Sequence, residues 1–556
     1  MKTGIFIILF LGLFIFSAQA TELNSPTDTT YIFLKDYGLY KTRKKNAIKH
    51  FYKALDDLKT DQQKILVFST GTYHFYPDGC KTKVYYEAGS INENPKVCAF
   101  HFENIKNLVI DGRGSHLIFH QEMQPFTFDN CQNITLKNMT IDWEQPFIAQ
   151  AEVLRVTEHY MDIGLDPRES PYRLVDGKIF FEIGNGQQNE WNSTLEFDRK
   201  GRFIVPQTGD TPCLGEHWDA YHAEPTMPGI VRLHFSFERK PQIGNYLILQ
   251  HSEPASAGVF ITKSKNLTIQ NLRLYHSPGH GVLAQRSKDL TFNEFQAIPN
   301  RSRNRYFASN GNGLNIVNCS GNVSVNNCTF QGLANEAVSS ENINAFIDEI
   351  TSENDAEILD LATQLTIRNS AFKNSPGSGI RIANTGKVII ENNSFESSGS
   401  AILITSNLES THRSSATSEV LIQDNIFFPI CNSGIYSNNE AIITIKGNST
   451  PANEQPIFYR QNIRIEGNQF SVFDYPLLFA QFVDGLSFNR NTVERSLDFA
   501  PFNNRQYSLS FEQCKSVNIL NNSFSEDVLG KNIFLKKTPE NQLNIDLNSK
   551  LRIEKY

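Results

Sequence analysis

Apolar and polar positions alternate along this chain in a short phrase that recurs many times. Three examples are NITLKNMTI from Asn133, NVSVNNCTF from Asn322 and NIRIEGNQF from Asn462. In each phrase apolar side chains stand at every second position, an Asn or a similar residue follows, and apolar side chains then return. A period of two is typical of a β-strand that buries one of its faces. The chain is therefore predicted to consist of short strands that share a core.

The phrases recur at the spacing of a repeating, coiled fold. From Asp289 onward their starts lie 33, 42, 23, 32, 43, 23 and 31 residues apart. The shortest spacing suits one short coil, and the longer ones add a loop to such a coil. We therefore predict an all-β fold, a right-handed parallel β-helix whose coils pair with their neighbours and bury a continuous core. A leucine-rich repeat is disfavoured because its leucine spacing is absent.

Asparagines stand at the sixth or seventh place of many phrases, where the strand is expected to bend. Asn tolerates the left-handed backbone conformation and therefore suits a sharp bend. The residues expected to form these bends are Asn138, Asn271, Asn327, Asn369, Asn392, Asn468 and Asn522.

The repeat is interrupted between residues 147 and 250. Segments such as VRLHFSF and turn signals such as KGR predict an inserted small antiparallel β-domain. Near the N-terminus, NAIKHFYKALDDLK has apolar residues at helical spacing and predicts a helix that caps the coils. The predicted organisation is a signal peptide at 1–20, an N-terminal cap and first coils at 21–146, the inserted domain at 147–250, the main β-helix at 251–530 and a C-terminal tail at 531–556.

The first twenty residues have the composition of an export signal. Lys2 is followed by an apolar run over 5–16 and by the small-residue sequence Ala-Gln-Ala at 18–20. This order predicts a signal peptide cleaved after Ala20, so the protein is expected to be secreted or periplasmic. The apolar run is too short to span a bilayer and no later segment is long enough, so we expect no membrane partner.

Charge and cysteine content narrow the possible partners further. The formal net charge is −7, which disfavours nucleic acid as a partner. The eight cysteines lack the close pairs of a metal site, and we expect no metal and no other cofactor. Cys80 and Cys98 are the nearest candidates for a disulfide, whereas Cys319 and Cys328 suit small apolar positions in a core. The oligomeric state does not follow from the sequence.

In the predicted main helix, Asn312 lies about one short coil before the neighbouring residues Asn335 and Glu336. Asn312 lies in SNGNGLNI, Asn335 and Glu336 lie in GLANEAV, and the two asparagines are 23 residues apart. Side chains one coil apart on the same face lie about 4.8 Å from each other. We therefore expect these three residues to form one cluster, in which Glu336 is the carboxylate. Ordinary turn asparagines are the alternative explanation of the pattern.

Five segments resemble successive blocks of glycoside hydrolase family 110, the α-1,3-galactosidases that remove terminal galactose from blood-group-B-type and linear glycans. The blocks are IDWEQPFIAQAEV (141–153), YHSPGHGVLAQRSKDL (275–290), NRYFASNGNGLNI (304–316), FQGLANEAVSSEN (330–342) and GKVIIENNSFESSGSAILI (386–404). They follow the family order, and the interruption of the repeat fits the β-barrel domain of that family. The resemblance implies that the partner is a glycan with terminal α-linked galactose.

The resemblance also implies where the catalytic residues would lie. The family aspartates, in motifs like Ala-Asp-Ala-Thr-His and Met-Asp-Asp-Ala, fall on Asn312, Asn335 and Glu336. Asn has the shape of Asp and can bond to sugar hydroxyls, but it cannot transfer a proton. Since the loss of one proton-transfer group lowers a rate by roughly 10²–10⁴, we expect little or no hydrolysis of α-galactosides. An enzyme would need Glu336 and a second carboxylate, for which Glu341 is a candidate.

A sugar-binding groove also needs polar groups, a cation and an aromatic platform. The residues expected to supply them are Asn315, which falls on the His of the first family motif, Arg305, Trp143 and His280. For Trp143, core packing is the alternative to stacking on a sugar. His280 has a groove role and a packing role as its alternatives.

The sequence thus predicts a carbohydrate-active β-helix protein and leaves two functions open, hydrolysis of the α-galactosidase type and non-catalytic glycan binding. A polygalacturonase is a weaker alternative. SPGHG (277–281) and SGIRI (378–382) resemble its motifs, but its Gly-His-Gly follows the block that Asn312 would occupy, whereas here it precedes that block. A polysaccharide lyase is weaker as well, because its calcium carboxylates and basic residue cannot be assembled on one coil face.

Overall fold

The computed structural model describes most of the chain. The described residues are 29–40, 44–58, 62–87, 94–184, 186–206, 208, 213–341, 363–383, 386–396, 399–405, 419–429, 440–447, 460–473, 476–500, 507–546 and 550–555. The predicted signal peptide lies outside them. Within the described part, no helix has both the length and the apolar composition needed to cross a membrane.

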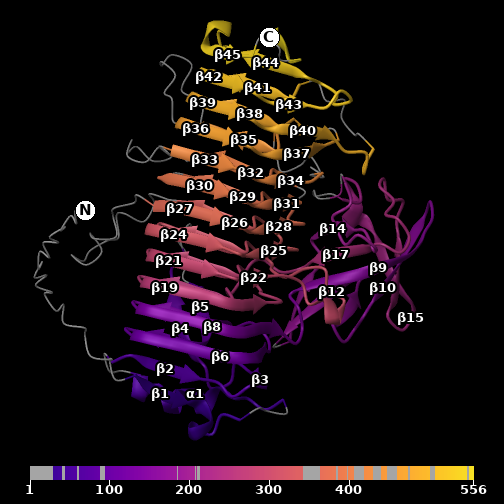
Figure 1. Cartoon of the computed structure of the whole chain (residues 1–556). Helices are drawn as coiled ribbons and strands as arrows, with labels where there is room; N and C mark the ends of the chain where they lie inside the picture. The colour runs from indigo at the N-terminus through magenta and orange to yellow at the C-terminus, as the bar shows by residue number, and fades with distance from the viewer. Residues whose placement is uncertain are drawn as a thin grey trace, which may run out of the picture.

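The parallel β-helix predicted from the repeat is confirmed (Figure 1). Its coils stack along one axis, and each coil contributes strands to three rows of parallel strands. The first row contains β1 (Thr30–Phe33), β2 (Lys64–Val67), β6 (Lys106–Phe119), β8 (Gln132–Trp143), β19 (Lys265–Leu274), β21 (Lys288–Asn293), β24 (Ser320–Asn326), β27 (Thr363–Arg368), β30 (Lys387–Glu391), β33 (Glu419–Gln423), β36 (Arg460–Glu466), β39 (Val483–Asn489), β42 (Lys515–Leu520) and β45 (Leu543–Ile545).

The second row begins with β3, continues through the second halves of the long strands β6, β8 and β19, and is then formed by short strands. Its separate strands are β3 (Thr72–Phe75), β22 (Gln296–Ala297), β25 (Thr329–Gln331), β28 (Ala371–Lys373), β31 (Ser394–Glu396), β34 (Ile426–Phe427), β37 (Gln469–Val472), β40 (Thr492–Arg495) and β43 (Ser523–Phe524).

The third row carries the residues of the candidate site. It contains β5 (Asn94–Glu103), β7 (Gln124–Asp129), β18 (Val259–Thr262), β20 (Val282–Gln285), β23 (Leu314–Val317), β26 (Val338–Glu341), β29 (Ile380–Ala383), β32 (Ile402–Thr405), β35 (Ile443–Ile445), β38 (Leu478–Gln481), β41 (Leu509–Glu512), β44 (Asn532–Lys536) and β46 (Arg552–Lys555), with β4 (Lys81–Tyr85) antiparallel to β5.

The alternation of the phrase explains how the coils stack. Ile134, Leu267 and Leu290 hold the second place of three successive phrases, pair in register and are buried in one core. Identical places of successive coils therefore meet, and the apolar places form continuous columns inside the helix. Cys319 and Cys328 lie in this core, as predicted. Cys80 and Cys98, the expected disulfide pair, are both free thiols.

The bends follow the sixth place of the phrase. Asn138, Asn271, Asn327, Asn369 and Asn392 all have φ between 47° and 60°, so the prediction is confirmed for these five residues. It is wrong for Asn468 and Asn522, which hold the seventh place; there the left-handed residues are Gly467 and Asn521.

The seventh-place asparagines instead point into the corner of the helix. Asn425 donates to Asn468 (3.0 Å) and Asn468 donates to Asn491 (3.0 Å), each through a side-chain amide. Asn393 and Asn522 extend the same ladder at its two ends. A buried amide that bonds to the next coil on both sides leaves no polar group unpaired, which is why Asn is compatible with this interior position.

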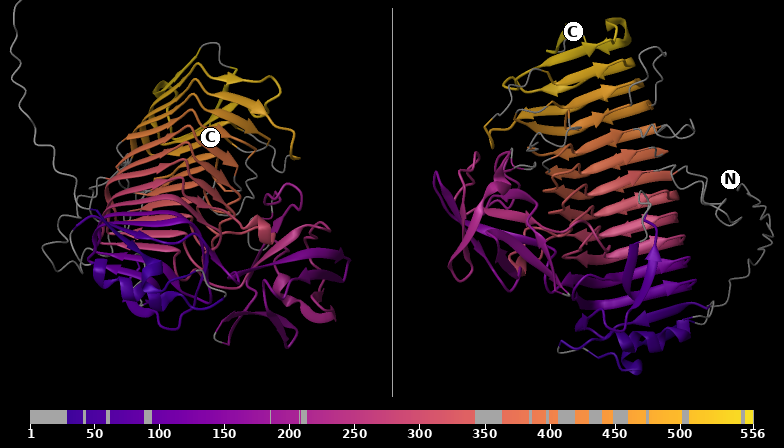
Figure 2. Two further views of the ribbon diagram at one scale, coloured as in Figure 1. Left: turned by 60° about the horizontal axis from the view of Figure 1, so that its bottom comes forward. Right: turned by 180° about the vertical axis from the view of Figure 1, so that it is seen from behind.

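The interruption of the repeat is a separate antiparallel domain that projects from the side of the helix (Figure 2). Its six-stranded sheet contains β9 (Ile148–Val156), β10 (Tyr160–Leu165), β14 (Ser193–Phe197), β15 (His222–Met227), β16 (Ile230–His234) and β17 (Tyr246–Gln250), and a smaller sheet contains β11 (Tyr172–Val175), β12 (Lys178–Gly184) and β13 (Gln187–Glu190). Trp191 and Trp218 pack in its own core. We call this domain the barrel.

Both ends of the helix extend the stacking. The helix α1 (Ile48–Ala54) buries Ile48, Phe51 and Ala54 against the first coils, as expected of a cap. At the other end β44 pairs in parallel with β41, and β46 with β44. The segment predicted as a C-terminal tail at 531–556 therefore contributes further strands to the third row.

Candidate functional site

The centre of the candidate site is a turn that precedes each strand of the third row. The backbone amide of Gly281 donates to the carbonyl of Asn312 (2.8 Å), and that of Gly313 donates to the carbonyl of Glu336 (3.1 Å). Successive coils thus place His280, Asn312 and Glu336 at the same height of the turn. The pairing of Leu314 with Val338 sets a register of 24 residues, so Asn312 lies opposite Glu336 and not, as the 23-residue spacing predicted, opposite Asn335.

The cluster predicted from the sequence is therefore brought together, with a shift of one residue. Asn312 is 6% exposed, and Asn335 and Glu336 are half-buried. Among the described residues, no hydrogen bond reaches the side-chain amide of Asn312 or of Asn335. Two amide groups and one carboxyl group with hydrogen-bonding capacity to spare suit the hydroxyl groups of a sugar.

His280 supports this turn from the coil below. Its Nδ1 accepts the backbone N–H of Asn312 at 3.0 Å, and its Nε2 lies 3.4 Å from the side-chain nitrogen of Asn315. Burial lowers the pKa of His280 to about 4, so the ring is neutral and carries its proton on Nε2. If the nitrogen and oxygen of the Asn315 amide are exchanged, the oxygen, which has no hydrogen-bond partner among the described residues, accepts this proton. His280 and Asn315 thus act together to position Asn312.

Glu336 lies in a charged group that it shares with Glu341 and Arg381. Burial raises the pKa of Glu336 above its ordinary value of 4.5, the Arg381 guanidinium and the backbone amide of Glu336 oppose this effect, and the charge of Glu341 adds to it. Arg381 and Glu341 form an ion pair at 2.8 Å, and their side chains are 25% and 17% exposed. We call these three residues the Glu336 group.

The register of the third row explains why these charges meet. Asn315 on β23, Ser339 on β26 and Arg381 on β29 are register partners on three successive coils. Glu341 ends β26, two residues beyond Ser339 on the same outer face. Arg381 therefore lies one coil above Ser339, from where its side chain reaches Glu341.

A glycine permits the close approach of the coil that follows. A Cβ on Gly377 would lie 2.8 Å from the carbonyl carbon of Asn335 and 2.9 Å from the amide nitrogen of Glu336. Real Cβ atoms do not come this close to backbone atoms, so any side chain at position 377 would displace the turn that presents Asn335 and Glu336.

The barrel packs directly beside this turn. Ala334, the neighbour of Asn335, is buried in an apolar cluster with Phe307 of the helix and Phe197 and Ile248 of the barrel. Asn374, on the following coil, donates to the backbone carbonyl of Arg202 in the barrel (2.8 Å). One wall beside the Glu336 group is thus supplied by the barrel.

Arg305 does not belong to this site. Its side chain is 3% exposed and forms ion pairs with Asp142 (2.8 Å) and Glu169 (2.9 Å). It also donates to the carbonyls of Trp143 (3.0 Å) and Glu144 (3.2 Å). Because these partners engage its guanidinium at the junction of helix and barrel, Arg305 joins the two domains, and the predicted role in sugar binding is not supported.

Trp143 is also a structural residue. It is fully buried, packs against Phe119 and His276, and donates from its indole N–H to the carbonyl of Gln121 (3.0 Å). A ring without an exposed face cannot stack on a sugar, so the core-packing alternative for Trp143 is the correct one.

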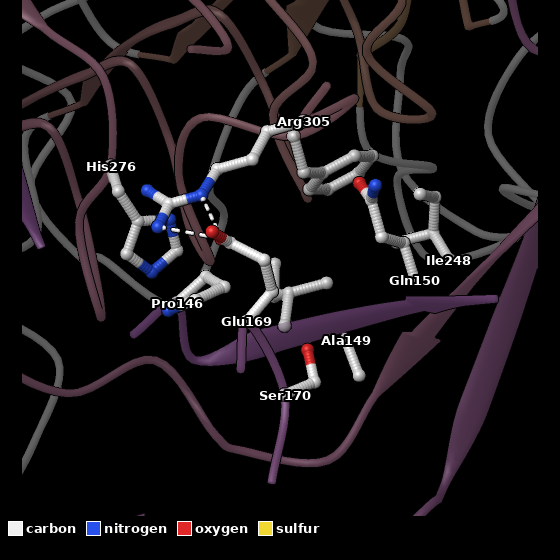
Figure 3. A pocket seen from close by; sticks show the side chains of 10 residues that line it. Pro146, Ala149, Gln150, Glu169, Ser170, Ile248, His276 and Arg305 are labelled. Atoms are coloured by element: carbon white, nitrogen blue, oxygen red, sulfur yellow. Dashed lines mark hydrogen bonds and ion pairs between the residues drawn. The ribbon is translucent and has the colours of Figure 1, made fainter. Parts of the chain in front are cut away.

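A small pocket lies at the same junction (Figure 3). Glu169 and Arg305 form its polar side, and Pro146 and Ile248 lie among its apolar lining residues. His276 lines it as well; its Nδ1 is buried without a hydrogen-bond partner among the described residues, while its Nε2 accepts the backbone N–H of Phe147 (2.9 Å). The pocket is distinct from the Glu336 group, and its charged residues are already paired with each other.

Arg381 is the site residue that the sequence did not indicate as such. Its segment, SGIRI, was noticed only for its likeness to a polygalacturonase motif. The usable signal was the coil register, which places residue 381 beside the strand that ends at Glu341. In the described part of the chain, no group of three His, Cys, Asp or Glu side chains is arranged to hold a metal ion.

Comparisons with known proteins match both domains. Residues 149–247 match the model of the GLAA-B beta-barrel domain I, and residues 257–412 and 350–549 match the right handed beta helix region. The chain is 34% identical to alpha-1,3-galactosidase B of Bacteroides thetaiotaomicron, over 97% of this chain and 98% of that protein. It is 26% identical to alpha-1,3-galactosidase A of Bacteroides fragilis (strain YCH46), over the same shares of the two chains.

Among solved structures, the surface protein and adhesin PfbA of Streptococcus pneumoniae has a TM-score of 0.43 to this chain. The two share 14% sequence identity, over 94% of this chain and 100% of the other.

Proposed function

Because the chain belongs to the α-1,3-galactosidase family, glycoside hydrolase family 110, we propose that it binds glycans with terminal α-linked galactose at the turn of Asn312, Asn335 and Glu336. The coarser conclusion, a protein of carbohydrate-active type on a β-helix scaffold, follows from the family itself. The terminal sugar and its linkage are the proposal.

One observation carries the proposal. Asn312 and Glu336 lie opposite each other on adjacent coils, at the two positions that match family aspartates, and Asn335 adjoins Glu336. Asn has the shape of Asp, and its amide offers an acceptor oxygen and a donor NH2 group, both of which can bond to sugar hydroxyls. The proton-transfer groups are not retained, because neither asparagine can act as an acid or a base. We therefore expect binding to outlast hydrolysis, with slow turnover or none.

The test compares the native protein with the triple variant Asn312→Asp, Asn335→Asp, Glu336→Asp. Calorimetry with galactose-α-1,3-galactose measures affinity, and release of free galactose measures turnover. We expect both proteins to bind the disaccharide and the triple variant to hydrolyse it faster. Galactose-β-1,4-glucose serves as the linkage control and should not bind.

Two outcomes would contradict the proposal. If neither protein binds α-galactosides, the inference from the family to this chain fails. Fast native turnover, at a rate that the triple variant does not exceed, would show that the asparagines do not impair the site.

We also propose that the protein acts outside the cytoplasm after removal of residues 1–20. The motive is the order of charged, apolar and small residues in that segment. N-terminal sequencing of the protein from its native host should begin at Thr21. Recovery of the intact N-terminus from the cytoplasmic fraction would overturn this proposal.

A further inference from the structure

The Glu336 group contains a second carboxylate at a position where the family motifs have no aspartate. We propose that Glu336 and Glu341 form a substitute acid–base pair for slow glycoside hydrolysis, with Glu336 as the acid, Glu341 as the base and Arg381 as the positioning residue. This inference rests on the proposed function, since it concerns the same site and the same sugar.

The geometry gives the two carboxylates different surroundings. Glu336 stands in the turn, two residues before β26 begins, and is half-buried. Glu341 stands at the end of β26, on the outer face, where Arg381 holds it in an ion pair at 2.8 Å. The residues are close enough for the charges of both Glu341 and Arg381 to act on Glu336.

The surroundings of Glu336 favour its protonated form. Burial is the largest influence on Glu336 and raises its pKa, and the negative charge of Glu341 raises it further. Glu336 therefore keeps its proton to a higher pH than an ordinary glutamate, as a general acid requires. Glu341 has the Arg381 guanidinium as its immediate partner at 2.8 Å and is the other carboxyl group beside Glu336, so the role of base falls to it. Glycoside cleavage uses two carboxyl groups, one as the acid and one as the base.

The other groups that face Glu336 do not disturb this division. On the coil below, Asn312 is neutral at every pH of interest, and His280 is neutral because its pKa is lowered to about 4. Asn335 on the same turn is neutral as well. On the coil above, Arg381 is the cation that acts on Glu336, and on β26 Glu341 is the anion that does so.

The proposed step balances in atoms and charge. Glu336 gives its proton to the glycosidic oxygen as the bond from that oxygen to C1 of galactose breaks. A water molecule attacks C1, and Glu341 takes a proton from that water. Free galactose and the shortened glycan leave, and a proton exchange through solvent returns Glu336 to its acid form and Glu341 to its carboxylate. One carboxylic acid and one carboxylate are what glycoside cleavage needs.

The test measures galactose release from galactose-α-1,3-galactose by the native protein and by Glu336→Gln, Glu341→Gln and the double variant. We expect slow native turnover, a loss of roughly 10²-fold or more in kcat for either single variant, and disaccharide affinity within a few-fold of native. The pH–rate profile of the native protein should fall on its alkaline side as Glu336 loses its proton. Glu391→Gln is the matched control. Glu391 on β30 also forms an ion pair with an arginine, Arg368 on β27, at 3.3 Å, and this variant should turn over the disaccharide as the native protein does.

A role as a base differs from a structural role in one further measurement. Glu341→Ala, supplied with sodium azide, should recover bond cleavage and form galactosyl azide, because azide needs no base to attack C1 while Glu336 still protonates the leaving oxygen. Mass spectrometry identifies this product. A variant that had merely lost its fold would not be rescued.

The inference is overturned if native turnover does not exceed that of the double variant, if Glu341→Gln leaves kcat unchanged, or if azide yields no galactosyl azide. Retained affinity in those cases leaves the proposed binding function standing. Absence of affinity in the native protein would remove both.

Discussion

Two arginines of this protein lie in clusters with carboxylates. The two clusters differ in how much of the arginine is exposed and in whether neighbouring groups can still bond to a ligand. Arg305, at the junction of helix and barrel, bonds to two carboxylates and two carbonyls and is 3% exposed. Arg381, on the outer face of the helix, forms one ion pair and is 25% exposed. Both arginines lie in segments whose sequence resembles functional motifs, Arg305 in NRYFASNGNGLNI and Arg381 in SGIRI. Only the second adjoins groups with unused hydrogen-bonding capacity.

The difference shows how a structural cluster can be told from a site that can meet a ligand. The fully satisfied Arg305 contributes to stability by keeping the charge of Asp142 paired, and a buried charge that loses its partner is costly. The partly exposed Arg381 adds little to stability, because water screens its ion pair. It can instead adjust the electrostatics of a neighbour, which here is Glu336. Changes at the two arginines should therefore separate stability from function.

The largest effect is expected for Arg305→Met. This change leaves Asp142 buried with the amide groups of Asn300 and Trp143 but without a cation. The free energy of unfolding should fall by about 3–5 kcal/mol, measured by urea titration. Arg368→Met, which breaks an exposed pair, is the control and should cost no more than about 1 kcal/mol. A comparable small loss in both variants would show that the junction cluster is not structural.

Gly377→Ala should have the next largest effect. The added Cβ meets the backbone of Asn335 and Glu336, and overpacking of this kind costs about 1–3 kcal/mol. Because the displaced backbone belongs to the site, galactoside affinity should fall as well. Gly112→Ala creates a similar clash, 2.6 Å from the carbonyl oxygen of Asn138 on β8, in the first row and away from the site. It should lower stability and leave affinity unchanged; equal affinity losses in both variants would contradict the placement of the site.

Arg381→Met should change stability by no more than about 1 kcal/mol but alter the pH dependence of the site. Arg381 lowers the pKa of Glu336, so its removal should raise that pKa further. The alkaline side of the pH profile, followed by galactoside binding or turnover, should then move to higher pH. Arg381→Lys keeps the charge and should shift the profile less. A profile that moves to lower pH would contradict the prediction that Arg381 lowers the pKa of Glu336.

The smallest effect is expected for Glu336→Gln, and it is a stabilisation. The pKa of Glu336 is raised in the folded protein, so the native protein loses stability as the pH rises from 4.5 through the folded pKa. Gln carries no charge and avoids this loss. The melting temperature of the variant should thus match that of the native protein at low pH and exceed it at neutral pH. A variant that is less stable at neutral pH would contradict the raised pKa.

The alternation of the repeat was enough to predict the helix, because each phrase carries its own strand pattern and needs no distant partner. It also predicted the bends at the sixth place. It failed at Asn468 and Asn522, because a sixth-place and a seventh-place asparagine look alike in sequence. They differ only in whether the side chain turns to solvent or into the corner, and that depends on the amide of the next coil.

The sequence was enough to predict which segments meet at the candidate site, but not which side chains contact each other there. The spacing of Asn312 and Asn335 placed them near each other, yet one extra residue in the turn shifted the true register by one position. Trp143 and Arg305 were wrongly assigned because their partners, Gln121, Asp142 and Glu169, come from separate segments. The pairing of Arg381 with Glu341 was not visible either, since 40 residues separate them and the sequence alone does not fix the register of their strands.

The ladder of amides that begins at Asn393 has a consequence for how this scaffold can change in evolution. Each inner rung makes the same bonds to the rung before it and to the rung after it. A whole coil gained or lost in that half would leave the chemistry of the corner intact, so the length of the molecule is free to drift there. The coils from 266 to 336 carry Leu272, Phe295 and Cys328 at this corner. They lack an interchangeable rung, so a coil gained or lost there would change the packing of the corner beneath the candidate site.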